Sequence, residues 1–203
     1  MKRLLPALLG ITLTFPVGAQ SVAFSLNDLT TLSTNADGGT GGLLFTVGTS
    51  CLQLTSLGYF DANQDGLSVP HEVGIFDAST RRLLTSVVVP TIGATLRDGF
   101  QYEAITPLTL LPGRQYLLAA EDAARNVDPQ NISGVFVHGT ALSLSGYYFT
   151  NNPPCLVFPT TPFSKPYADA NFTYQVIPEP SPFAFLTGFA ALGFALVRRR
   201  HPH

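Results

Sequence analysis

The chain contains no tryptophan, one methionine and two cysteines, and charged residues make up only 12% of its 203 residues. Without tryptophan it lacks one common platform for stacking sugar rings, although seven tyrosines and fifteen phenylalanines offer other aromatic faces. Between Gln20 and Ile177, six basic residues oppose twelve acidic ones, which gives a net charge of −6. The basic residues are Arg81, Arg82, Arg97, Arg114, Arg125 and Lys165. Because no basic face is available to neutralise phosphates, the composition predicts no nucleic acid partner.

The two cysteines, Cys51 and Cys155, belong to no Cys-x-x-Cys motif and to no Cys/His cluster with zinc spacing. In an oxidising compartment they could pair and close a loop of about a hundred residues, which the loop-entropy relation values at about 4.7 kcal/mol. In the alternative, the two thiols lie apart in the core, since the sequence does not give the distance between their Cα atoms.

Helical periodicity is nearly absent from the central part of the chain. Short β-branched and aromatic runs alternate there with turn signals such as Asp65-Gly66, Asp98-Gly99 and Pro112-Gly113. This pattern predicts one all-β domain over residues 20–176, an antiparallel β-sandwich or jelly roll. Strands are expected at residues 22–26, 43–47, 52–60, 72–76, 83–89, 100–110, 115–120, 135–137, 142–149 and 172–176.

Two segments depart from the strand pattern. A short helix is expected over residues 121–126. The stretch from Asn151 to Tyr167 holds five prolines, which cannot donate to a central sheet ladder, so it is expected to form an irregular loop packed over one sheet.

The N-terminal residues have the composition of a secretory signal. Met1-Lys2-Arg3 is basic, residues 4–17 are apolar, and Val17-Gly18-Ala19 supplies small residues for signal peptidase. We therefore expect a signal peptide over residues 1–19, cleaved after Ala19, with a retained signal anchor as the alternative.

The C-terminal residues 177–203 combine three elements in a fixed order: Pro178-Glu179-Pro180, an apolar run over residues 182–197, and Arg198-Arg199-Arg200. As a helix the run would be roughly 24 Å long, short for a spanning segment, which needs about 20 residues. The arginines would be held on the cytoplasmic side, so the segment suits a transient stop in the inner membrane, with the rest of the protein on the other side.

This tail resembles the PEP-CTERM sorting signal of exported bacterial proteins. The resemblance implies recognition by a membrane-embedded exosortase, cleavage at or near Pro178-Glu179-Pro180, and release or attachment of the body at the cell surface among extracellular polysaccharide. The alternative is an ordinary C-terminal anchor that is never cut.

A second resemblance covers residues 54–120 and points to a bacterial domain of unknown function found in exported proteins. It brings no established activity, and supports export and a β fold. The residues that carry it are Ser56-Leu57-Gly58-Tyr59-Phe60-Asp61, Asp65-Gly66-Leu67, His71-Glu72-Val73-Gly74-Ile75-Phe76-Asp77, Leu83-Leu84-Thr85-Ser86, Gly99-Phe100-Gln101-Tyr102, Thr106-Pro107-Leu108-Thr109-Leu110 and Gly113-Arg114-Gln115-Tyr116.

Within that region, Asp61, Asn63, Asp65 and Glu72 satisfy the spacing of a calcium-binding EF-hand loop. The flanking residues, however, read as strands and not as the helices that such a loop needs. A Ca²⁺ site is one interpretation, with Asp61, Asn63 and Asp65 favoured as ligands over Glu72. A polar turn in which these side chains bind their own backbone is the other.

Catalytic signals are weak. His71 and His138 have no evident nucleophile or orienting partner in sequence, so His71 is expected to be a hydrogen-bonded structural residue. The run Tyr147-Tyr148-Phe149 could offer a sugar platform, but alternation along a strand would send at least one ring into the core. We therefore favour a non-enzymatic surface or matrix protein, with a polysaccharide- or calcium-binding module and a hydrolase assembled from distant strands as alternatives.

Overall fold

The computed structural model describes residues 19–26, 32–33, 38–122, 128–131, 134–151, 153, 155–164 and 169–178. This part of the chain is all-β with antiparallel sheets, and it contains no helix. Within it, no helix meets the length and hydropathy needed to cross a membrane. Most of the predicted signal peptide and the tail beyond Pro178 lie outside the described residues.

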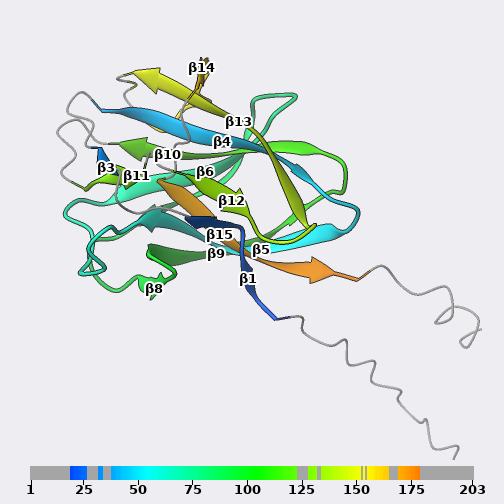
Figure 1. Cartoon of the computed structure of the whole chain (residues 1–203), viewed down its shortest axis with the longest axis horizontal. Coiled ribbons are helices and arrows are strands. Elements are labelled where there is room, and N and C mark those ends of the chain that lie inside the picture. The colour runs from blue at the N-terminus through cyan, green and yellow to red at the C-terminus, as the bar shows by residue number, and fades with distance from the viewer. Residues whose placement is uncertain are drawn as a thin grey trace, which may run out of the picture.

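One layer of the fold is a five-stranded sheet in the order β1-β15-β5-β9-β8 (Figure 1). Its strands are β1 (Ser21–Val22), β15 (Ala170–Ile177), β5 (Cys51–Phe60), β9 (Phe100–Leu110) and β8 (Thr95–Arg97). The β8–β9 hairpin turns through Asp98 and Gly99, both with positive φ (49° and 79°), as the Asp-Gly signal predicts.

The other layer is a six-stranded sheet in the order β14-β13-β4-β10-β6-β7. Its strands are β14 (Thr161–Phe163), β13 (Leu142–Asn151), β4 (Gly39–Val47), β10 (Gln115–Asp122), β6 (His71–Asp77) and β7 (Leu83–Val89). Two short ribbons complete the fold: β3 (Leu32–Ser33) pairs with β11 (Gln130–Asn131), and β2 (Phe24–Leu26) pairs with β12 (Val135–Val137).

The two sheets pack face to face in a sandwich-like arrangement, because alternate residues of both point into one core. Phe45 of β4 and Phe172 of β15 meet across the layers, with ring centroids 5.3 Å apart. Phe24 of β2 inserts against both rings, at 6.1 Å and 5.8 Å. The β2–β12 ribbon therefore closes one side of the core.

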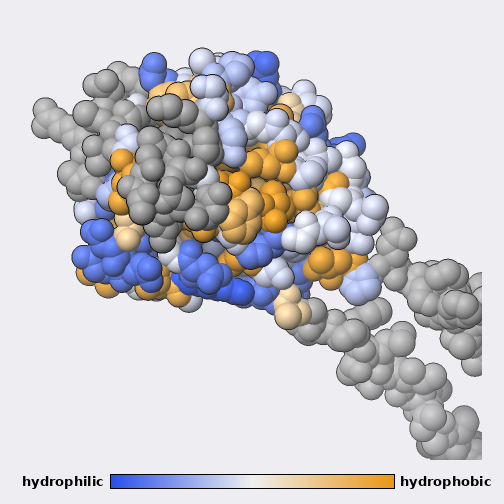
Figure 2. Space-filling view, in the orientation of Figure 1, coloured by the Kyte–Doolittle hydropathy of each residue, from blue (hydrophilic) through white to orange (hydrophobic). Residues whose placement is uncertain are grey.

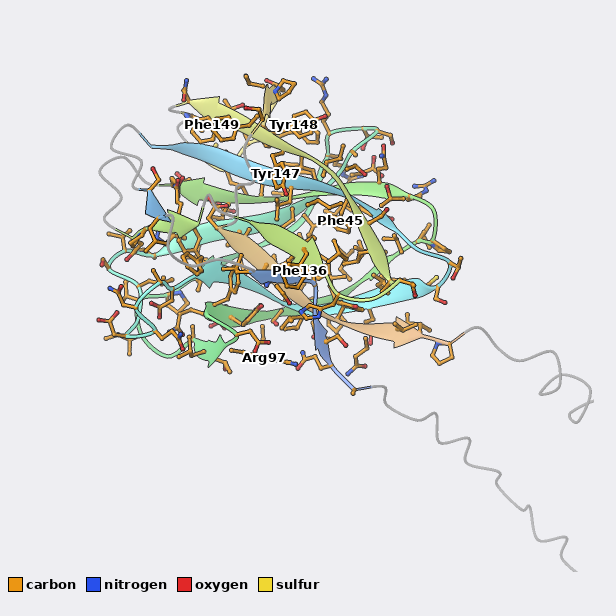
Figure 3. The ribbon with its side chains drawn as sticks, in the orientation of Figure 1. Phe45, Arg97, Phe136, Tyr147, Tyr148 and Phe149 are labelled. Atoms are coloured by element: carbon orange, nitrogen blue, oxygen red, sulfur yellow. The ribbon has the colours of Figure 1, made fainter. Side chains whose placement is uncertain are left out.

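An apolar patch remains in the middle of the face shown in Figure 2. Figure 3 labels Phe136 and Tyr147 in that region. Phe136, on the outer side of the β2–β12 ribbon, is 48% exposed, whereas Tyr147 packs against the core.

Nine of the ten expected strands are present, three with the predicted bounds and six of them one to four residues longer. The tenth, expected over residues 22–26, is divided into β1 and β2. The prediction of a helix over residues 121–126 is wrong for its first two residues. Glu121 and Asp122 continue strand β10 and pair with Thr40 and Gly39 of β4. Residues 123–127 lie outside the described residues. In the proline-rich stretch, residues 155–160 form no strand, but β14 follows them and pairs with β13.

Residues 155–160 cover part of the outer face of the six-stranded sheet. Leu156 and Phe158 pack there against Phe76 of β6 and Leu117 of β10. The approach is close: a Cβ at Gly42 would lie 2.9 Å from Pro159, and one at Gly74 would lie 2.7 Å from Leu156. Glycine at these positions lets the loop lie directly on the sheet.

Candidate functional site

The predicted calcium loop is organised as a turn around Asp61. The Asp61 carboxylate is buried and accepts hydrogen bonds from the Gln64 amide (2.8 Å), the Gly66 amide (3.0 Å) and the Gln101 side chain (2.8 Å). These are the contacts of the polar turn, which ties the loop to β9 of the five-stranded sheet.

The other members of the predicted calcium set do not join Asp61. Asn63 and Asp65 are exposed, and Glu72 accepts a bond from Ser86 of the neighbouring strand (2.7 Å). Burial, followed by the charge of Glu72, raises the pKa of Glu121. In the described ranges, no three acidic, histidine or cysteine side chains are grouped to hold a metal.

His71 lies in a buried polar cluster between the sheets. Its side chain is 0% exposed, its Nε2 lies 3.0 Å from Asp128 Oδ2, and its Nδ1 lies 3.1 Å from the Glu121 carbonyl oxygen. The ring stacks on Tyr59, with centroids 3.6 Å apart. This is the hydrogen-bonded structural environment that we expected for His71.

The cluster extends to a second carboxylate. Tyr59 donates its hydroxyl to Asp122 (2.5 Å), and Gln130 donates to the same carboxylate. Burial alone would raise the pKa of Asp128, but the bonds from His71 and from the amides of Ser68 and Val69 outweigh it and lower that pKa. Both histidine nitrogens are occupied, and the Asp128 side chain is only 8% exposed, so the cluster joins the loop after β5 to the end of β10.

His138 lies in a more open setting. Its Nε2 contacts the Ser25 hydroxyl across the β2–β12 ribbon, and both residues line a hollow of about 500 Å³ that also includes Gln64, Asp98 and Gly99. Asp98 pairs with Arg97 (3.6 Å), and within the described part of the chain no hydrogen bond or ion pair joins it to His138.

The aromatic run on β13 divides between the two faces of its sheet, as alternation predicts. Tyr147 packs against the core on the side of Phe45, whereas Tyr148 lies on the opposite side of the strand (Figure 3). Phe158 packs with Tyr148 on that outer side. Only the Tyr148 side of this run contributes to the outer surface of the sheet.

Tyr148 lines a hollow of about 210 Å³ on that outer face, which we name the Arg81 groove. Its lining includes Leu44, Leu117, Tyr148 and Phe158, together with the polar residues Arg81 and Gln115. The Arg81 guanidinium lies over the Phe158 ring, 5.5 Å from its centroid. A second hollow of about 360 Å³ shares Ala78 and Gln115 with it and includes Arg114.

The turn between β6 and β7 places Arg81 at this groove. Asp77 Oδ1 accepts the amides of Ser79 (3.0 Å) and Thr80 (2.8 Å) and both of their hydroxyls (2.7 and 3.0 Å). The Ser79 hydroxyl, followed by the Thr80 bonds, lowers the pKa of Asp77 to about 2. Arg81 itself has φ of 59°, which the tight turn imposes.

The structure does not bring the two cysteines together. Cys51 begins β5 and pairs with Ile177, whereas Cys155 is exposed beside Leu156 on the outer face of the other sheet. Val157 contacts Thr40, at the start of β4, and Cys51 follows the end of that strand at Val47. Thr40 and Val47 lie about 23 Å apart along β4, so the two cysteines lie toward opposite ends of this strand, and both are free thiols in the structure.

The predicted processing residues fall at or beyond the ends of the described chain. Ala19 is the first described residue and Pro178, which is exposed, is the last. Glu179, Pro180 and Arg198, Arg199 and Arg200 lie outside the described residues.

Sequence reasoning missed the Arg81 groove. Its signal was present in Asp77-Ala-Ser79-Thr80-Arg81-Arg82, an acceptor followed by two hydroxyl donors and then two of the few basic residues in the body. Phe158 and Arg114 come close to these residues only in the folded chain, and no local pattern predicts that proximity.

No protein-family profile matches this chain. A comparison with curated proteins likewise finds no significant match.

Proposed function

We propose that this is an exported, non-enzymatic cell-surface or extracellular-matrix protein. The signal peptide directs export of the β-sandwich, and the C-terminal segment holds it in the inner membrane. An exosortase then cleaves the chain at or near Pro178-Glu179-Pro180. The basic cluster Arg198-Arg199-Arg200 keeps the end of the segment in the cytoplasm, and the body reaches the surface or the surrounding polysaccharide.

The observation that supports this proposal is the position of the first and last strands of the β-sandwich. β1 and β15 are antiparallel neighbours, with Ser21 opposite Tyr174, so residues before Ser21 and after Tyr174 run toward the same end of the sheet (Figure 1). Gln20, the first residue after the predicted cut, is bound to Thr55 (2.6 Å) and Thr173 (2.8 Å). Ile177 is the last paired residue. Both cuts would therefore fall just outside the bonded body.

Intact mass measurement and cell fractionation of the protein in its own host test the proposal. The mature protein should begin at Gln20 and end near Pro178. Glu179→Ala, or deletion of Arg198–Arg200, should leave a membrane-bound precursor. An unchanged mature mass in both variants would contradict exosortase processing, and a mature chain retaining residues 181–203 would identify an uncut anchor.

A second candidate function, a hydrolase, is favoured by the contact between Ser25 and His138 in an open hollow. A fluorophosphonate probe tests it: the Ser25 oxygen would bond to phosphorus, fluoride would leave, and His138 would accept the hydroxyl proton. Labelling that is lost in both Ser25→Ala and His138→Ala, and kept in Ser143→Ala, would support a hydrolase. Absence of labelling in the wild type would leave the non-enzymatic function.

A further inference from the structure

We propose that the Arg81 groove binds an acidic polysaccharide, through stacking of a sugar ring on Tyr148 and Phe158 and pairing of its carboxylate with Arg81. This inference rests on the proposed function, because only an exported body would meet such a polymer. It assigns the ligand to the outer face of the six-stranded sheet and not to the Asp61 loop.

The aromatic and aliphatic lining gives the groove its affinity for a ring. Leu117 is fully buried at the floor, while Tyr148 and Phe158 are half-buried and leave part of their rings facing the hollow. A sugar presents one face of C–H groups, which packs well on such rings. Gln115 and Thr160, both exposed at the rim, can exchange hydrogen bonds with sugar hydroxyls.

The charge at the groove is opposite to that of the body. Three of the six basic residues of the body, Arg81, Arg82 and Arg114, lie on this turn and the adjoining hollow, in a body with a net charge of −6. The Asp77 carboxylate beside them is turned inward to Ser79 and Thr80, and its second oxygen is 3.8 Å from Arg114. The ligand should therefore be an anion, and the bidentate geometry of arginine suits a carboxylate.

The turn holds Arg81 in place before a ligand arrives. The Arg81 amide donates to the Asp77 carbonyl (2.8 Å), the Asp77 amide donates to the Arg82 carbonyl (2.9 Å), and the Arg81 side chain rests on Phe158. A guanidinium that is already positioned loses less conformational entropy on binding. The two hollows that share Ala78 and Gln115 give room for successive rings of one chain.

Affinity electrophoresis and calorimetry on the mature protein from its host test this site. The probes are a polyuronate, neutral dextran as the uncharged sugar, and polyglutamate as an anion without rings. Arg81→Gln and Tyr148→Ser should each weaken polyuronate binding about tenfold or more. Arg97→Gln removes an equal charge from the other sheet and should change it less than about twofold.

Binding of polyuronate alone, weakened by Arg81→Gln and Tyr148→Ser, supports the site. Equal binding of polyglutamate, equal loss in Arg97→Gln, stronger binding of dextran, or no binding of polyuronate overturns it. The same preparations report the mature mass, so a correctly processed protein that does not bind would reject the groove and leave the proposed function standing.

Discussion

At the scale of single residues, Asp77 couples the shape of the Arg81 turn to pH. The folded protein favours its ionised form, because the bonds from Ser79 and Thr80 hold its pKa near 2, below the ordinary value of 3.8. The stabilisation is therefore fully present above about pH 4 and is lost as the pH falls through about 2.

We expect Asp77→Asn to flatten this part of the acid dependence. Thermal unfolding between about pH 5 and pH 2 should show a smaller fall in melting temperature for the variant than for the wild type. Asp65→Asn, which changes an exposed carboxylate, should follow the wild-type curve. Identical curves for all three proteins would show that ionisation of Asp77 adds nothing to stability in this pH range.

Asp61 is the residue that distinguishes a polar turn from a metal site. Asp61→Ala removes the acceptor of three donors and should lower the free energy of unfolding by about 1–3 kcal/mol, whether or not calcium is present. Urea denaturation with calcium and with a chelator measures this, with Asp65→Ala as the exposed control. Calcium stabilisation of the wild type that is lost in both variants would instead establish the loop as a calcium site.

The role of a residue could be predicted from the sequence only when its partners lie nearby along the chain. The turn role of Asp61 was one of two interpretations that local spacing allowed, since Gln64 and Gly66 are close by. The buried role of His71 was expected, but its partner Asp128 is 57 residues away and could not be named. The position of Arg81 in a groove could not be predicted, because Phe158, on which its side chain rests, comes from another part of the chain.

At the scale of elements, the contact between residues 155–160 and the six-stranded sheet shapes the Arg81 groove. Gly42 has no room for a side chain, because a Cβ there would lie 2.8 Å from Leu117 and 2.9 Å from Pro159. Gly42→Val should push this loop off the sheet and cost about 1–3 kcal/mol in unfolding free energy, as overpacking typically does.

Hydrogen exchange followed by mass spectrometry checks this expectation. Protection should fall at residues 156–160 and at β14, and stay unchanged at β5 and β9 of the other sheet. Gly113→Ala is a control at an open turn with no atom within 4 Å, although its φ of 70° adds some backbone strain. Normal protection over residues 156–160 in Gly42→Val would mean that the loop does not depend on this close approach.

Strands could be predicted where their apolar residues form a run long enough to show alternation. The strands β5, β6, β7, β9 and β10 carry alternating or continuous apolar runs, and their bounds were predicted to within two residues. The prediction for β4 missed its first four residues, which include three glycines. Strands β3, β8, β11 and β14 have only two or three residues, too few to show alternation. In β14, Pro162 pairs with Tyr148 at the sheet edge, where a missing amide donor is tolerated.

At the scale of the whole molecule, the neighbouring strands β1 and β15 determine what can be removed. Tyr174 is 4% exposed and packs against Phe172 in the core, whereas Val176 is 43% exposed and Pro178 follows the last paired residue. The residues that contribute to the stability of the β-sandwich therefore end between Tyr174 and Pro178.

Two truncations of the protein should differ sharply for this reason. A chain of residues 20–178 should have a free energy of unfolding within about 0.5 kcal/mol of that of the full-length chain, because it loses no paired strand and no core side chain of the described body. A chain ending at Thr173 loses Tyr174 and the pairing of residues 174–177 with β5, and should unfold at least about 3 kcal/mol more easily. Urea denaturation of both chains measures the difference. Marked destabilisation of the 20–178 chain would show that segments beyond these ends support the fold. The export proposal would then fail, because it requires that both termini can be removed without loss of stability.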